Sequence, residues 1–192
     1  MGTILKPRPR LILNAALWLL YLEQELVYVG DEAIVEPSGE TRRLGVDFGL
    51  RWQITDLIFT NFDLNYAFAR SIEEPQGENR IPLAPNFTSS GALIFKKNNF
   101  NANLQYRWIA DRPANEDNSI IAEGYFVTDL SANYFWKNLG IGFKIDNLFN
   151  TEWNETQFAT ESRLNFETES TEEIHFTPGT PFSIRANLSY EF

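Results

Sequence analysis

The chain has 192 residues, the length of one domain, and its 16 lysines and arginines against 26 aspartates and glutamates give a net charge of −10. This acidic balance argues against a nucleic-acid partner, because such binders normally offer phosphates a basic surface. With no cysteine and one histidine, the sequence excludes disulfides, zinc–thiolate sites and multi-histidine metal sites, and we predict no cofactor. Mean hydropathy is −0.30, and no stretch approaches the roughly 20 apolar residues of a membrane-spanning helix.

Residues 1–10 are expected to be an N-terminal tail or a truncation point. Basic residues at positions 6, 8 and 10 precede an apolar run at 11–22, which loosely resembles a signal peptide. No small-residue cleavage site follows, because the run ends in Tyr21-Leu22-Glu23. The signal-peptide interpretation is therefore the weaker one.

Residues 11–29 are ambiguous between strand and helix. Leu17 and Leu19 alternate as in a strand, but Trp18 between them is apolar too. An amphipathic helix over residues 11–26 is the alternative. We favour a strand, because strands follow it throughout the chain.

From residue 44 onward, apolar and polar residues alternate with period two, which predicts strands with one apolar and one polar face. Near the C-terminus, for example, Phe182 and Ile184 alternate with Ser183 and Arg185. The alternation is weakest at 86–96. With the first segment included, about eight strands are expected, at residues 11–29, 44–54, 62–68, 86–96, 100–108, 126–136, 139–145 and 182–192.

The connections between these strands alternate in length. Tight turns are expected at 55–57, 97–99 and 137–138, and long polar loops at 30–41, 71–85, 111–124 and 150–181. Short turns at one end and long loops at the other are typical of outer-membrane barrels. The expected fold class is therefore all-β, an antiparallel up-and-down transmembrane β-barrel portion in a single domain over residues 11–192.

Period two does not say which face points outward. A soluble barrel has an apolar interior, whereas a membrane barrel has an apolar exterior. The apolar face carries too many large aromatic side chains for an eight-stranded interior, and Trp52, Trp108 and Trp136 fall near strand ends, where an interfacial belt belongs. The polar face also contains little lysine or glutamate. These features favour the membrane barrel, with a soluble β-sheet domain as the alternative.

The C-terminal segments carry a resemblance to a known family. Residues 145–153, Ile-Asp-Asn-Leu-Phe-Asn-Thr-Glu-Trp, are similar to an "NLF(D/N)xxY" segment, with Trp153 where tyrosine is usual. Residues 178–192 are similar to a closing strand with a terminal phenylalanine, and residues 81–87 fit a strand entry after a long loop. On these segments, the chain from about residue 11 to residue 192 resembles the C-terminal part of TonB-dependent outer-membrane receptors.

This resemblance implies a larger barrel of about 22 strands with a plugged lumen, located in the bacterial outer membrane. Such receptors import scarce ligands, including ferric siderophores and other metal chelates, with energy from an inner-membrane complex. The plug domain is absent from this sequence, so we expect a segment of such a receptor. Expected partners are outer-membrane lipid, the barrel-assembly machinery, and the missing N-terminal barrel and plug, through which alone TonB would act.

Candidate site residues follow from the two faces and the resemblance. Predicted to face the lumen, as a ligand path, a plug contact or simply salt bridges in the wall, are Arg43, Arg51, Arg107, Asp47, Asp63 and Asp129. His175, in an acidic loop, is a candidate for ligand contact at the extracellular mouth, with a solvated loop as the alternative. The terminal residues Phe192, Tyr190 and Leu188 are expected to form the signal that the assembly machinery reads.

We predict that the chain is not an enzyme, because a single loop histidine supplies no nucleophile–base pair. The main alternative function is a self-contained eight-stranded outer-membrane barrel with a structural or adhesion role. A barrel enzyme ranks below both.

Overall fold

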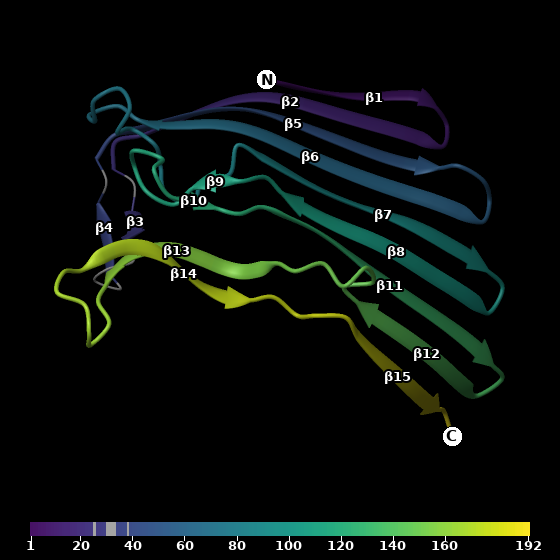
Figure 1. The fold of residues 1–192 in the computed structure, drawn as a ribbon. Helices are drawn as coiled ribbons and strands as arrows, with labels where there is room; N and C mark the ends of the chain where they lie inside the picture. The colour runs from purple at the N-terminus through teal and green to yellow at the C-terminus, as the bar shows by residue number, and fades with distance from the viewer. Residues whose placement is uncertain (25, 30–33, 38) are drawn as a thin grey trace.

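The computed structural model describes residues 1–24, 26–29, 34–37 and 39–192, and it is built from β-strands (Figure 1). Within those residues, no helix is long and apolar enough to cross a membrane. One antiparallel sheet has nine strands in the order β1-β2-β5-β6-β7-β8-β11-β12-β15. Their bounds are β1 Gly2–Arg8, β2 Leu11–Leu22, β5 Thr41–Gln53, β6 Ile58–Ser71, β7 Phe87–Lys97, β8 Phe100–Ile109, β11 Tyr125–Trp136, β12 Leu139–Asp146 and β15 Ser183–Tyr190.

The strands of this sheet follow one another in chain order, so the topology is up-and-down as the sequence predicts. The tight turns lie at one end of the sheet, on the right in Figure 1, and the long connections lie at the other. Asn98 and Lys137 begin two of these turns with φ of 50° and 52°. A left-handed residue lets two neighbouring strands reverse within a couple of residues.

The N-terminal residues form a strand, so the expected tail at residues 1–10 and the count of about eight strands both need correction. β1 pairs with β2 from Gly2 opposite Ala16 to Arg8 opposite Leu11, with a register shift after Leu5. The sequence hides this strand because Lys6-Pro7-Arg8 interrupts the alternation. β1 lies at the edge of the sheet, where a proline is tolerated because half of the strand's backbone groups have no ladder partner.

β2 is a strand and not the alternative helix. Leu17 and Leu19 lie on one face of it and are 60% and 67% exposed. Trp18 lies on the opposite face, and its ring covers Gly45 so closely that an added Cβ there would be 2.1 Å away. Leu20 and Leu22 lie on the same face as Trp18, so β2 is apolar on both faces, and that is why its periodicity is ambiguous.

The main sheet has an apolar face and a polar face, as the alternation predicts. Few hydrophobic side chains are buried among the described residues, whereas large ones such as Leu188 are up to 72% exposed on the apolar face. Aromatic side chains collect near both ends of this face, which suits a surface that crosses two membrane interfaces. They are Tyr66, Phe68, Trp108 and Phe126 toward the long connections, and Trp52, Phe100, Trp136 and Tyr190 toward the turns.

Among the described residues, three short two-stranded sheets lie outside the main sheet, within the connections expected to be loops and at residues 26–29, which were expected to continue the strand that begins at residue 11. The largest, β13 (Asn154–Ser162) with β14 (Thr171–Pro178), extends from the end of the main sheet that carries the long connections (Figure 1). Polar residues on both faces hide these strands from a periodicity analysis. The others are β3 (Leu26–Val29) with β4 (Ile34–Pro37) and β9 (Arg112–Pro113) with β10 (Ile121–Ala122). In the expected loop 30–41, residues 30–33 and 38 lie outside the described residues.

Candidate functional site

The predicted charged residues share the polar face of the sheet and form cross-strand pairs. Arg51 of β5 donates two hydrogen bonds from Nη2 to Asp63 of β6, at 3.0 Å to Oδ1 and 2.8 Å to Oδ2. Gly49 lies directly opposite Asp63 in the register, which leaves room for this diagonal pair. Asp47 accepts a hydrogen bond from Asn65, and Arg43 is half-buried on the same face. The geometry brings these groups together, while their assignment to a lumen stays a prediction.

Asp129 of β11 is the most enclosed of these charges, at 7% exposed. Its Oδ1 accepts the backbone N–H of Asn147 at 2.9 Å, and its Oδ2 accepts the amide of Gln105 at 3.4 Å. The guanidinium of Arg107 lies 3.8 Å from Oδ2. Buried charge is tolerated where it is paired and hydrogen-bonded, and these contacts supply both.

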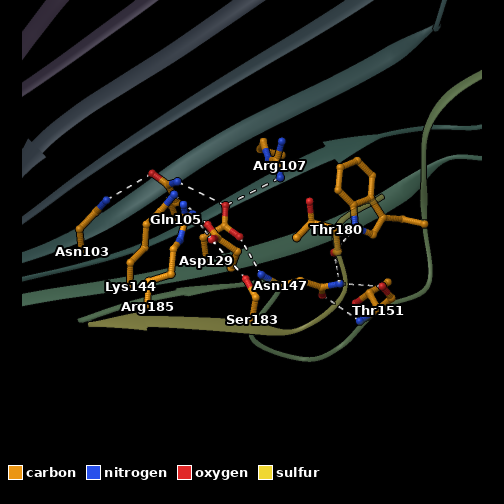
Figure 2. A network of polar contacts seen from close by, with 12 residues as sticks. Asn103, Gln105, Arg107, Asp129, Lys144, Asn147, Thr151, Thr180, Ser183 and Arg185 are labelled. Carbon is orange, nitrogen blue, oxygen red and sulfur yellow. Dashed lines mark hydrogen bonds and ion pairs between the residues drawn. The ribbon is translucent and has the colours of Figure 1, made fainter. Parts of the chain in front are cut away.

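Asp146, at the end of β12, forms ion pairs with two neighbouring cations. Its carboxylate lies 2.8 Å from Nζ of Lys144 and also binds Arg185 of β15. Ser183 donates a weaker hydrogen bond to it at 3.5 Å. Figure 2 shows the contacts of Asp129 beside Lys144, Ser183 and Arg185, which are the partners of Asp146. The two groups meet at the adjacent residues Asp146 and Asn147, and together they form a polar network on β8, β11, β12 and β15.

This network opens onto a cavity of about 440 Å³. Among its lining residues are Arg107, Asp129, Asp146, Asn147, Trp153, Glu155 and Arg185. Guanidinium, carboxylate, amide and indole groups at one wall can hydrogen-bond and ion-pair a polar solute. In the part of the chain that the structure describes, no group of three or more histidine or acidic residues could hold a metal ion.

Asn147, the asparagine that begins the Asn-Leu-Phe motif of residues 145–153, holds together the chain segments beside this cavity. It is 1% exposed and has a φ of 52°. Its amide donates to the carbonyl of Thr151 at 2.8 Å and to the carbonyl of Thr180 at 3.1 Å, while its Oδ1 accepts Thr151 N–H at 2.8 Å. Sequence reasoning did not assign this role, because Thr180 is 33 residues away; the only local signal is an asparagine, which tolerates positive φ.

Trp153 also contacts the segment that contains Thr180. Its indole N–H donates to Thr180 O at 3.0 Å, and its carbonyl accepts Gly179 N–H at 2.7 Å. An added Cβ at Gly179 would lie 2.1 Å from the ring, so only glycine allows this close approach. The Arg107 guanidinium lies 5.3 Å from the ring centroid, within range of a cation–π contact.

His175 lies on β14 rather than in an irregular loop. Its Nε2 is 3.2 Å from the Ser162 hydroxyl and 3.9 Å from a Glu173 oxygen. These contacts lie within the β13–β14 hairpin and do not reach the cavity network. A ligand contact at His175 stays a prediction.

The proposed assembly signal lies at the edge of the sheet. Leu188 and Tyr190 of β15 are exposed on the apolar face, and Phe192 follows the strand with its ring 5.2 Å from that of Tyr190. Recognition of these residues by the barrel-assembly machinery stays a prediction.

Outside the main sheet, two charged groups have shifted pKa values. Hydrogen bonds from the Ser119 backbone N–H and hydroxyl lower the pKa of Asp117. Burial lowers the pKa of Arg112, with Tyr125 and Asp111 opposing the shift. Both remain charged at neutral pH, because arginine titrates far above it and Asp117 shifts further below it.

Comparison with known proteins places this sheet in a family. No curated protein matches the chain. The solved structures that match its fold include three receptors or transporters. The ferric yersiniabactin uptake receptor FyuA from Yersinia pestis has a TM-score of 0.72 and 14% sequence identity, and the match covers 100% of this chain and 29% of that one. The siderophore receptor PiuA from Acinetobacter baumannii has a TM-score of 0.66 and 17% identity, with coverage of 94% and 26%, and the unliganded ferric citrate transporter FecA has a TM-score of 0.71 and 16% identity, with coverage of 100% and 30%.

The chain spans less than a third of each of these solved chains. The nine-stranded sheet is accordingly a partial barrel. The family described as "TonB dependent receptor-like, beta-barrel" matches residues 2–148, which is most of the chain and includes β1 through β12. The chain therefore belongs to the family of TonB-dependent receptor-like β-barrels.

Proposed function

We propose that this chain forms part of the wall of a bacterial outer-membrane receptor for energy-coupled uptake of a scarce ligand, a ferric siderophore or another metal chelate. The observation that carries this proposal is the family match over residues 2–148. The similar structures include uptake receptors for ferric yersiniabactin and a transporter of ferric citrate. Both of these ligands are ferric chelates, which is why we propose a metal chelate as the ligand class of this chain.

Placement in the outer membrane is supported by the two faces of the sheet. Exposed leucines and phenylalanines on the apolar face would associate in water, but they suit contact with lipid tails. The aromatic residues near both ends of that face suit the two interfaces of a bilayer. The polar face then borders the lumen, where hydrogen-bonded charge pairs such as Arg51–Asp63 are compatible with water.

Within this receptor, the cavity beside Asp129 would offer a polar contact to the ligand or to the plug. The remaining strands and the plug would be supplied by the missing part of the receptor, and TonB would act only through that part. Insertion would depend on the barrel-assembly machinery. We propose no catalytic role.

The alternative of a self-contained eight-stranded barrel receives less support. The sheet has nine strands, and β1 and β15 are its two edges. They lie at opposite sides of the sheet in Figure 1. A closed barrel would require these edges to pair, because unpaired backbone groups in lipid are costly.

The proposal is tested by uptake in a strain of the source bacterium that lacks the gene containing this chain. Cells starved of iron, copper or cobalt would receive the corresponding radiolabelled chelate, for example ferric citrate or a ferric catecholate chelate, with and without a protonophore. We expect loss of energy-dependent uptake of at least one iron, copper or cobalt chelate, restored by the wild-type gene. Unchanged uptake of every chelate tested under starvation would contradict the proposal.

A further inference from the structure

A second cavity, of about 780 Å³, lies at the end of the sheet that carries the long connections. It is separate from the cavity beside Asp129 and is lined in part by Arg42, Arg70 and Arg80. Arg42 of β5 and Arg70 of β6 are directly opposite each other in the register. Both lie on the apolar face of the sheet, two residues beyond Leu44 and Phe68. Arg80 comes from the connection between β6 and β7.

These arginines concentrate positive charge at one place. Within the described residues, none of them forms an ion pair with a carboxylate, although Glu74 and Asp117 also line the cavity. Asp117 is engaged by the backbone N–H and hydroxyl of Ser119, at 2.9 and 2.7 Å. Like charges directly opposite across a sheet are destabilising. An anion between the guanidinium groups would offset this repulsion.

The Arg70 side chain is held in place for such a contact. Its guanidinium carbon lies 4.0 Å from the centroid of the Phe68 ring, and its Nη1 donates to the Ala69 carbonyl at 2.5 Å. A guanidinium fixed by stacking loses little freedom when it binds. Its planar fork of donors matches the oxygens of a phosphate group.

The position of Arg42 and Arg70 along their strands indicates that the phosphate belongs to a lipid headgroup. Along β5 and β6 the apolar face passes from Val46 and Tyr66 through Leu44 and Phe68 to the arginine pair. Two residues of a strand span about 7 Å. The arginines therefore lie about 7 Å beyond Leu44 and Phe68, which is close to the thickness of the headgroup layer on one side of a bilayer. Phe68 is 41% exposed beside them, which leaves apolar surface for an acyl chain.

We propose that Arg42, Arg70 and Arg80 bind the phosphate group of a membrane-lipid headgroup at the outer surface of the barrel. This inference rests on the membrane placement in the proposed function, but it does not depend on ligand uptake. The site is a lipid contact on the outside of the wall, which the uptake route does not use.

The test uses the protein that contains this chain, purified from outer membranes as the cell makes it. It would be placed in phosphatidylcholine nanodiscs with increasing phosphatidic acid, whose headgroup is a phosphate monoester. Thermal unfolding of the sheet is followed by circular dichroism. For the wild type we expect the midpoint to rise with phosphatidic acid and to saturate. In Arg42→Gln and Arg70→Gln, half-saturation should require about tenfold more phosphatidic acid.

Lys97→Gln is the matched control, because Lys97 lies exposed on the same face of β7 at the opposite end of the sheet. It should respond like the wild type. An equal loss in Lys97→Gln would mean diffuse surface charge and would overturn the site. If inorganic phosphate at matched ionic strength raised the midpoint equally in pure phosphatidylcholine, the ligand would be soluble and the lipid proposal would be wrong.

Folding is checked by the midpoints in pure phosphatidylcholine, which should be no lower than that of the wild type, because Arg42→Gln and Arg70→Gln each remove the repulsion between the two arginines. If a strand variant does not fold, Arg80→Gln, outside the sheet, gives the same test. Because the readout is lipid dependence of unfolding, its failure leaves the uptake proposal standing. If the lipid dependence of unfolding were found but the gene were not needed for uptake, the uptake proposal would fail and the lipid site would stand.

Discussion

Asn147 joins the two chain segments that flank the β13–β14 hairpin, because its side chain bonds to Thr151 before the hairpin and to Thr180 after it. Its amide joins the loop after β12 to the carbonyl of Thr180, just before β15. We expect Asn147→Gly to lower the free energy of unfolding by about 2–4 kcal/mol, because the three hydrogen bonds made by its buried side chain are lost. Glycine keeps the positive φ, so the loss reports the hydrogen bonds. Urea unfolding in lipid bilayers measures it.

Asn118→Gly is the control for that experiment. Asn118 also has a positive φ, of 63°, but lies exposed in the connection between β9 and β10. Its substitution should change stability by less than about 0.5 kcal/mol. Equal effects of the two glycine substitutions would refute the role given to the Asn147 amide.

The face assignment predicts opposite outcomes for two neighbouring residues of β15. Leu188 lies on the apolar face and Asn187 on the polar face. Leu188→Arg should cost about 2–4 kcal/mol, because a charge near the bilayer midplane is costly, whereas Asn187→Arg should cost much less. Refolding into lipid vesicles measures both. Equal costs would rule out lipid contact on the apolar face.

At the scale of elements, the β13–β14 hairpin is separable from the main sheet. It docks through Gln157, which exchanges hydrogen bonds of 3.0 and 2.7 Å with the backbone of Glu123. Replacing residues 155–177 by a short Gly-Ser linker leaves Trp153 and Gly179 in place. We expect normal outer-membrane levels and heat-dependent gel migration, with ligand uptake lowered about tenfold or more because contacts of the mouth are removed.

Gln157→Ala is the milder form of this experiment. It removes the two hydrogen bonds to Glu123 but keeps the hairpin and its hydrogen bond from Asn115 to Glu172, so a smaller loss of uptake is expected. If the linker variant kept full uptake, the hairpin would have no part in ligand capture. If it failed to insert, the hairpin would belong to the folding unit of the barrel.

β15 with its terminal aromatic is predicted to act during assembly. Deleting Phe192 should lower the outer-membrane level of the receptor far more than Phe182→Ala does. Both side chains are exposed aromatics near the ends of β15, so the comparison separates a terminal signal from a general aromatic effect. Quantitative blots of outer-membrane fractions measure the levels. Normal levels after the Phe192 deletion would contradict the signal.

The sequence predicted those elements whose two faces differ. β5, β8 and β12 alternate cleanly, and each was expected within a few residues of its observed bounds. β1 was missed because Lys6-Pro7-Arg8 interrupts its pattern. β13 and β14 were missed because polar residues stand on both of their faces, even though Ala159 and Ile174 pack against Ala114 and Ala122. Periodicity reports a difference in environment between faces, so it fails where that difference is small.

The site was predictable only in part for a related reason. Alternation placed Arg51 and Asp63 on one face, and the structure pairs them. The roles of Asn147 and Trp153 depend on Thr180 and Gly179, far along the chain. Such contacts depend on how the connections return to the sheet, which local pattern does not encode.

At the scale of the whole molecule, the edges of the sheet limit what the chain does by itself. β1 and β15 each have a partner on only one side. Unpaired backbone groups in hydrocarbon cost several kcal/mol each, so the isolated chain must close, associate or aggregate. We expect no specific, saturable uptake of ferric citrate by liposomes that contain this chain alone. Such uptake would refute the view that the chain is one part of a receptor.

We expect the apolar face to meet lipid and the polar face to meet a water-filled lumen. Because this chain has no cysteine, a cysteine substituted into it is the only one that can be labelled within residues 1–192. The informative neighbours are Val46 and Asp47 on β5, and Leu104 and Asn103 on β8. The measurement is the labelling rate of each cysteine variant by a small water-soluble maleimide in intact outer membranes. We expect fast labelling at Asp47→Cys and Asn103→Cys and protection at Val46→Cys and Leu104→Cys. The reverse pattern, or equal labelling at all four positions, would show that the two faces are wrongly assigned.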